Sequence, residues 1–75
     1  MRCHFNLEDA HQTLFDREGV EVEDVDQAYT LAHEVAVEMF RQGQLKIGNC
    51  LGWRLEATDG SGVVLFTIRL DALLI

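Results

Sequence analysis

Residues 53–70 carry the pattern that most constrains the fold of this chain. Apolar and polar residues alternate on both sides of the glycine-rich sequence Asp59-Gly60-Ser61-Gly62. The apolar rows consist of Trp53, Leu55 and Ala57 before this sequence and of Val64, Phe66, Ile68 and Leu70 after it. A period of two on both sides of a short connection that contains glycine is typical of a β-hairpin. We therefore predict two antiparallel strands that share one apolar face.

Further extended segments are predicted in the first third of the chain. Residues 2–7 alternate, with Cys3, Phe5 and Leu7 on one side of the strand. Two shorter extended segments follow at residues 13–15 and 20–22. Gly19 lies between them and can adopt the positive φ angle that a turn requires.

A single helix is predicted between Asp24 and Gly43. Asp24 is a good N-cap, Gln27 completes a pattern resembling a capping box, and Gly43 is a typical C-terminal stop. The apolar stripe that would face the sheet consists of Ala28, Leu31, Ala32, Val35, Ala36, Met39 and Phe40. Tyr29 and Val37 lie off this stripe, and residues 44–51 are expected to form a connection.

These elements predict an α+β fold with the order β-β-α-β-β. Seventy-five residues suffice for one domain, so we expect residues 1–75 to form a single two-layer domain. One helix would pack on a four-stranded, mainly antiparallel sheet. The pattern leaves the order of the strands in the sheet open.

The formal net charge of −7 argues against some partners. Eight of the thirteen acidic residues lie within residues 8–26, before the helix or in its first turn, and such a field repels phosphate groups. We therefore expect neither nucleic acid nor an anionic membrane as a partner. No apolar run is long enough to span a bilayer, so the chain is expected to be soluble. The acidic loop of residues 16–26 has two interpretations, a solvated turn or a docking surface for a basic partner.

Cysteine and histidine residues do not form a recognisable metal or redox motif. Cys3 and Cys50 lie far apart in the sequence, and the N-terminus has no secretory signal. A cytoplasmic chain with free thiols is therefore favoured over a disulfide-bridged one. The three histidines are scattered, and His33 lacks the second histidine of a His-Glu-x-x-His motif. We expect no metal and no cofactor.

The residues also argue against catalysis. Ser61 lies in a hairpin turn, whereas a nucleophile elbow requires a strand-to-helix turn. Domains of this size rarely contain a pocket of the volume that catalysis needs. Trp53 is interpreted as a core residue that faces the helix, with a ligand platform as the alternative. We therefore predict that the protein is not an enzyme.

The order of several short motifs resembles a known family. An N-terminal strand at residues 2–7 is followed by Asp16-Arg17-Glu18-Gly19-Val20-Glu21, and Gly52-Trp53-Arg54-Leu55-Glu56-Ala57-Thr58-Asp59 precedes the last apolar strand. This order is similar to that of a family of short bacterial proteins of unknown function, common in alphaproteobacteria. The resemblance extends over nearly the whole chain. It implies the same fold and a cytoplasmic location, and it implies no activity.

The predicted function is that of a non-catalytic protein–protein interaction module that forms a homodimer. We predict a dimer because one helix–sheet interface does not obviously cover all the apolar residues. Those left over are Tyr29, Val37, Val63, Leu65, Leu73, Leu74 and Ile75. The alternative is an acidic regulatory or antitoxin-like adaptor. Such an adaptor would dock a basic partner through the loop carrying Asp16, Glu18 and Glu21.

Overall fold

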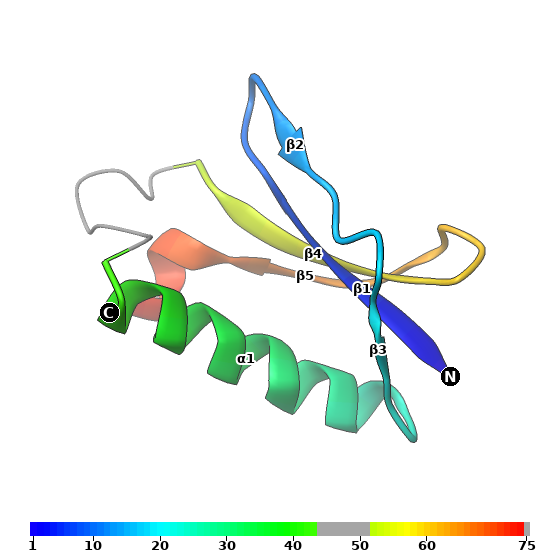
Figure 1. The fold of residues 1–75 in the computed structure, drawn as a ribbon. Helices are drawn as coiled ribbons and strands as arrows, with labels where there is room; N and C mark the ends of the chain where they lie inside the picture. The colour runs from blue at the N-terminus through cyan, green and yellow to red at the C-terminus, as the bar shows by residue number, and fades with distance from the viewer. Residues whose placement is uncertain (44–51, 75) are drawn as a thin grey trace.

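A computed structural model describes residues 1–43 and 52–74. In chain order the elements are β1 (Arg2–Glu8), β2 (Thr13–Leu14), β3 (Val20–Glu21), α1 (Val25–Arg41), β4 (Arg54–Asp59), β5 (Val64–Arg69) and the 3₁₀ helix η2 (Leu70–Leu74). All strand pairs within the described residues are antiparallel. Helix α1 lies across one face of the sheet (Figure 1), so the predicted two-layer α+β fold is confirmed.

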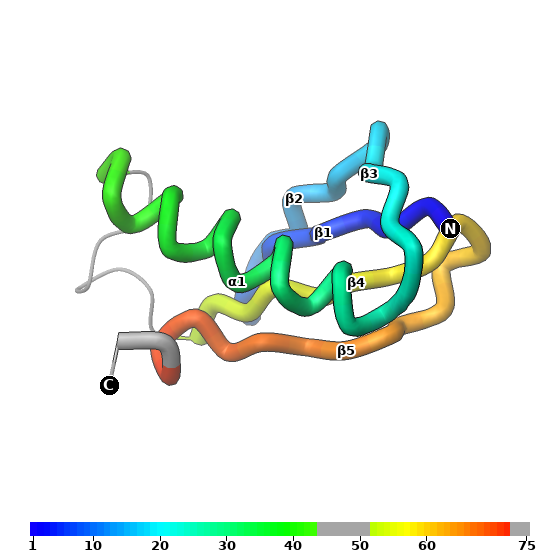
Figure 2. The backbone as a smooth tube through the Cα atoms, turned by 90° about the horizontal axis from the view of Figure 1, so that it is seen from below, coloured from blue at the N-terminus to red at the C-terminus, as the bar shows by residue number. Residues whose placement is uncertain are grey.

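The sheet has the strand order β2-β1-β4-β5, and β3 also pairs with β1. Strand β1 is therefore central, and it pairs with β4 from Cys3↔Asp59 to Glu8↔Arg54. Its other side meets β2 near Leu7 and β3 near Cys3. The two short strands together form one edge of the sheet, and β5 forms the opposite edge (Figure 2).

The predicted hairpin is formed by β4 and β5. Its turn is held by Asp59, whose Oδ1 accepts hydrogen bonds from the backbone N–H groups of Ser61 at 2.8 Å and Val63 at 3.0 Å. Gly62 adopts a φ of 86°, which favours glycine. The turn chemistry therefore follows the sequence pattern.

A β-bulge near the start of β5 changes the predicted alternation. Ala57 pairs with Phe66 while Thr58 pairs with Val64, which leaves Leu65 as the extra residue. As a result Val64, predicted on the core row, is 49% exposed. Leu65, predicted on the outer row, instead packs against buried residues of the core. Both predictions were wrong because a bulge shifts the side-chain rows by one residue.

Helix α1 begins and ends as predicted. The Asp24 side chain accepts a hydrogen bond from the backbone N–H of Gln27 at 2.8 Å. The Gln27 side chain accepts in turn from the backbone N–H of Glu23 at 2.6 Å, one residue earlier than a standard capping box. At the other end Gly43, with a φ of 79°, follows the C-cap residue Gln42.

The buried face of α1 is narrower than the predicted stripe. Its fully buried residues are alanines spaced four apart, namely Ala28, Ala32 and Ala36. Small side chains allow the helix backbone to approach the sheet closely. Val35 is 40% exposed, so its assignment to the core was wrong. It lies three residues after Ala32 and one before Ala36, at the margin of the buried face.

The core consists of two adjoining clusters. The first joins Ala32 and Ala36 to Leu55, Ile68 and Leu70, and Trp53 packs against it, as predicted for a core tryptophan. The second joins buried Cys3, Val22, Ala28 and Ala57. Apolar side chains of β1, β4 and β5 thus face the helix, and the opposite face of the sheet carries mainly polar residues.

Some sequence predictions lie outside the described residues. These are the connection at residues 44–51, the thiol of Cys50 and the terminal Ile75. Within residues 1–43 and 52–74, no helix is long and apolar enough to cross a membrane.

Candidate functional site

The loop of residues 15–19 separates β2 from β3 along the edge of β1. On the side opposite β4, strand β1 therefore lacks a neighbouring strand beside His4, Phe5 and Asn6. Side chains supply hydrogen bonds there instead. Oδ2 of Asp16 accepts from the backbone N–H of Phe5 at 3.2 Å, and Oδ1 accepts from that of Gly19 at 3.0 Å. Oδ1 of Asn6 accepts from the backbone N–H of Asp16 at 2.9 Å.

The same loop orients the imidazole ring of His4. Nδ1 of His4 lies 2.7 Å from the backbone carbonyl oxygen of Asp16. A carbonyl oxygen only accepts hydrogen bonds, so Nδ1 must carry the proton. In the neutral ring Nε2 is then an acceptor. Gly19 packs closely here, because a Cβ atom at this position would lie 2.9 Å from Cε1 of His4 and 2.9 Å from the carbonyl oxygen of Cys3.

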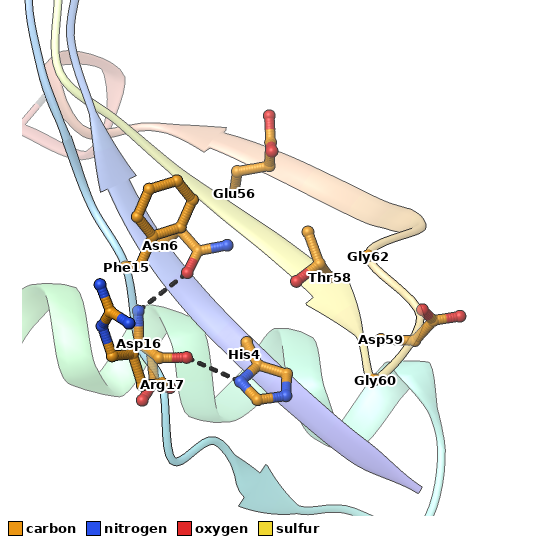
Figure 3. Close-up of a pocket in the computed structure, with 10 residues that line it drawn as sticks. All are labelled: His4, Asn6, Phe15, Asp16, Arg17, Glu56, Thr58, Asp59, Gly60 and Gly62. Carbon is orange, nitrogen blue, oxygen red and sulfur yellow. Dashed lines mark hydrogen bonds between the residues drawn. The ribbon is translucent and has the colours of Figure 1, made fainter.

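The loop and the polar face of the sheet line a wide, open depression of about 600 Å³, which we name the open-face hollow (Figure 3). It lies on the side of the sheet away from α1. Residues of β1, of the loop and of the β4–β5 hairpin line it: His4, Asn6, Phe15, Asp16, Arg17, Glu56, Thr58, Asp59, Gly60 and Gly62.

Two polar side chains of the open-face hollow are more than nine-tenths buried. Asn6 is 7% exposed and Thr58 is 8% exposed. The sheet register places Thr58 directly opposite His4 and Asn6 directly opposite Glu56. Oδ1 of Asn6 is paired with the backbone N–H of Asp16. Among residues 1–43 and 52–74, Oδ1 of Asp71 is the one buried side-chain polar atom without a hydrogen-bond partner, so neither Asn6 nor Thr58 carries such an atom.

Charged groups surround the open-face hollow on the same face of the sheet. Glu8 forms a 2.8 Å ion pair with Arg54. A hydrogen bond to Glu8, with burial and the nearby charge of Glu8, raises the pKa of Glu56 above its usual 4.5. No three His, Cys, Asp or Glu side chains gather closely enough to hold a metal ion in the part of the chain that the structure describes.

The structure disperses the residues predicted to mediate interactions. Asp16 holds the loop through its internal hydrogen bonds, and Glu21 forms ion pairs with the N-terminal amine at 3.4 Å and with Arg2 at 3.5 Å. The Glu18 side chain is exposed. Its backbone carbonyl oxygen accepts a hydrogen bond from Arg2 at 2.9 Å. The carboxylates of Asp16 and Glu21 therefore have partners within their own chain.

The apolar candidates occupy several surfaces. Tyr29 is exposed, yet its ring lies edge-on to that of Phe66 with centroids 5.3 Å apart. Val37 on α1 and Val63 in the hairpin turn are exposed, whereas Leu65 packs against the core. The backbones of Leu73 and Leu74 belong to η2, their side chains lie outside the described set, and Ile75 is not described.

The two edges of the sheet differ in how they are protected. The β2–β3 edge consists of two-residue strands separated by a loop, and it carries Asp16, Glu18 and Glu21. Short strands, interruptions and charges all discourage pairing with another chain. Strand β5 has six residues, and residues 60–70 contain no acidic side chain. Its outer side has no partner strand within residues 1–43 and 52–74.

Sequence reasoning missed His4, Asn6 and Thr58 as residues of one site. Their alternation marks them as polar residues on the face opposite the core. Only the pairing of β1 with β4 brings them together, and that pairing was not predictable from either strand alone. The spacing of His4 and Asn6 in one strand was the available signal.

Comparisons with known proteins give one match. The model of a family described as "Domain of unknown function (DUF6894)" matches residues 2–71. No curated protein and no solved structure matches the chain.

Proposed function

This chain belongs to the DUF6894 family, and we propose that it acts as a non-catalytic protein–protein interaction module that forms a homodimer through β5. The observation that carries this proposal is the contrast between the two sheet edges. An edge strand presents unpaired backbone N–H and C=O groups that another strand can satisfy. The β2–β3 edge is interrupted and acidic, whereas β5 is continuous after its bulge and free of acidic residues.

Charge favours a second copy at this edge. Each protomer has a formal net charge of −7, so two copies repel one another over most of their surfaces. Around β5, Arg69 forms an ion pair with Asp71 at 3.0 Å, and Arg54, its partner residue in β4, forms one with Glu8 at 2.8 Å. The strand itself carries no acidic side chain, so it adds no negative charge at the edge where the backbone is available. Antiparallel pairing of two β5 strands obeys two-fold symmetry and would create one continuous sheet across both protomers.

The internal contacts of the acidic loop support self-association over the docking of a basic partner. The Asp16 carboxylate accepts hydrogen bonds from two backbone N–H groups, and the Glu21 carboxylate pairs with two cationic groups of the same chain. Carboxylates that already have partners gain less from a basic ligand. Binding through backbone pairing also requires no reacting group, which is why we propose a non-catalytic role.

Sedimentation equilibrium over a hundredfold range of concentration tests the dimer. Wild-type protein should show a mass that rises from monomer to dimer. The variant Thr67→Lys adds a cation to β5 at an exposed position opposite Glu56. Two-fold pairing would bring both lysines close together, so we expect the dimer Kd to rise about tenfold or more.

The matched control is Thr13→Lys, which makes the same change in β2 at the opposite edge. It should leave the dimer Kd unchanged within about twofold, because β2 does not take part. A monomer mass for the wild type at every concentration contradicts the proposal. If Thr67→Lys and Thr13→Lys raise the dimer Kd equally, the interface does not lie at β5, and the assignment to β5 is contradicted.

A further inference from the structure

We propose that Tyr29 is the apolar anchor of the homodimer and packs against the helix-covered face of the second copy across the two-fold axis. This inference rests on the proposed pairing of two β5 strands and adds a helical layer to that interface. Tyr29 is the single tyrosine of the chain, and its side chain lies half exposed on α1. The occupant that we assign to the surface around its ring is a second copy of the same chain.

The ring of Tyr29 is continuous with the sheet edge at which the dimer is proposed. It lies edge-on to the ring of Phe66 in β5, with the two ring centroids 5.3 Å apart. The first turns of α1 lie close to β5 on the helix-covered face of the sheet (Figure 2). Phe66 packs against the core, whereas Tyr29 is 50% exposed. A large aromatic surface therefore remains in contact with solvent beside the edge strand.

Pairing of two β5 strands brings this surface against the same surface of the second copy. A two-fold axis between antiparallel strands of one sheet is perpendicular to that sheet, so both α1 helices lie on the same face. Paired strands lie about 5 Å apart, and side chains on the same face of the two strands are in contact. Phe66 would therefore meet the helix-facing side chains of the second β5, and Tyr29 would cover that contact from above.

The part of α1 around Tyr29 suits contact with an identical, negatively charged copy. Residues 27–33 contain no aspartate, glutamate, lysine or arginine, although the whole chain has a net charge of −7. Two copies therefore meet there without placing carboxylates against each other. Val25 lies one helical turn before Tyr29 and is 42% exposed, so it extends the apolar surface. Tyrosine is also one of the residues that most often dominate binding energy at protein interfaces.

Val37, the other exposed apolar residue that lies off the helix stripe in the sequence, does not share this position. It lies eight residues after Tyr29, about 12 Å farther along α1. Glu34 precedes it by three residues and Glu38 follows it directly. A second copy placed on Val37 would bring these carboxylates close to its own negative charges. We therefore assign the helical contact to Tyr29 and not to Val37.

Fluorine NMR on protein labelled with 3-fluorotyrosine tests the contact, because Tyr29 gives the only tyrosine signal. Over the concentration range used for sedimentation equilibrium, this signal should shift as the dimer forms and should follow the same Kd. Tyr29→Ala removes the ring and should raise the dimer Kd about tenfold or more. Tyr29→Phe keeps the ring and should leave the Kd unchanged within about twofold.

Val37→Ala is the control on the same helix and should change the dimer Kd by less than about twofold. Circular dichroism establishes that each variant remains folded, since Tyr29→Ala also loses the contact with Phe66. If Tyr29→Ala and Val37→Ala raise the Kd equally, the contact is not specific to Tyr29 and the inference is overturned. Equal weakening by Tyr29→Phe and Tyr29→Ala would assign the contact to the hydroxyl group and contradict an apolar anchor.

The failure of this inference can be told apart from the failure of the proposed dimer. If Thr67→Lys weakens the dimer but Tyr29→Ala does not, the β5 dimer stands and the role of Tyr29 is overturned. A fluorine signal that does not change while the mass rises from monomer to dimer has the same meaning. A monomer mass for the wild type at every concentration overturns both proposals.

Discussion

Oδ1 of Asn6 accepts a hydrogen bond from the backbone N–H of Asp16 at 2.9 Å and thereby fastens the loop of residues 15–19 to β1. The Asp16 carboxylate accepts in return from the backbone N–H of Phe5, the next residue back along β1. Two side chains thus replace the strand-to-strand bonds that β1 lacks between β2 and β3. These hydrogen bonds hold the loop in place as one wall of the open-face hollow, and the loop covers β1 between β2 and β3.

Removal of the Asp16 side chain should be strongly destabilising. In Asp16→Ala the backbone N–H groups of Phe5 and Gly19 both lose their acceptor. We expect the free energy of unfolding to fall by about 2 kcal/mol or more. Glu18→Ala is the control in the same loop, and because its carboxylate is exposed it should change stability by less than about 0.5 kcal/mol. Urea unfolding measures both, and similar small losses would contradict the structural role of Asp16.

Gly19 should tolerate substitution less well than another glycine of positive φ. A Cβ atom at Gly19 would meet the Cys3 carbonyl oxygen and the His4 ring at 2.9 Å, whereas nothing lies within 4 Å of one at Gly62. Both glycines have similar φ angles, 70° and 86°. We expect Gly62→Ala to cost about 1 kcal/mol from backbone strain alone, and Gly19→Ala to cost at least about 1 kcal/mol more. Thermal unfolding of the two variants side by side checks the difference.

The alanine face of α1 should resist enlargement. Ala32 is fully buried between the helix and the sheet, so Ala32→Leu inserts three carbon atoms where there is no room. We expect a loss of about 1–3 kcal/mol in the free energy of unfolding. Val35→Leu enlarges a residue on the exposed margin of the same helix and should change stability by less than about 0.5 kcal/mol. Equal effects in denaturant titrations would mean that α1 faces the sheet with a different side.

The thiol of Cys3 should make stability fall at high pH. Burial, followed by the charges of Asp16 and Asp59, raises its pKa above the usual 9.0. A raised pKa in the folded state stabilises the protein fully below pH 9, and the contribution is lost as the pH rises through the folded-state pKa. Unfolding of wild type and Cys3→Ala between about pH 8 and pH 10.5 measures this, since the difference between them should shrink as the pH rises.

Alkylation tests independently whether the thiol of Cys3 is buried. In a Cys50→Ser background Cys3 is the one remaining cysteine, and burial should keep it unreactive until the protein unfolds. Wild-type protein alkylated in denaturant without reductant should then show two modified cysteines. A single disulfide instead of two free thiols would contradict the reduced, cytoplasmic chain predicted from the sequence.

Local patterns in the sequence determined the helix and the hairpin. Asp24, Gln27 and Gly43 mark the ends of α1 through contacts with residues only a few positions away. Asp59 and Gly62 likewise hold the hairpin turn through bonds to their near neighbours. Such features are predictable because the interacting groups are close in the chain.

Only the tertiary structure decided the strand order, the bulge and the site. The sequence does not show that Leu65 is an extra residue, because a bulge is defined by the partner strand. Val35 has the helical spacing of a core residue, and its exposure follows from how closely the alanine face approaches the sheet. His4, Asn6 and Thr58 meet because β1 pairs with β4 across some fifty residues of chain. Long-range register is a property of the whole packed domain, so no local pattern of residues encodes it.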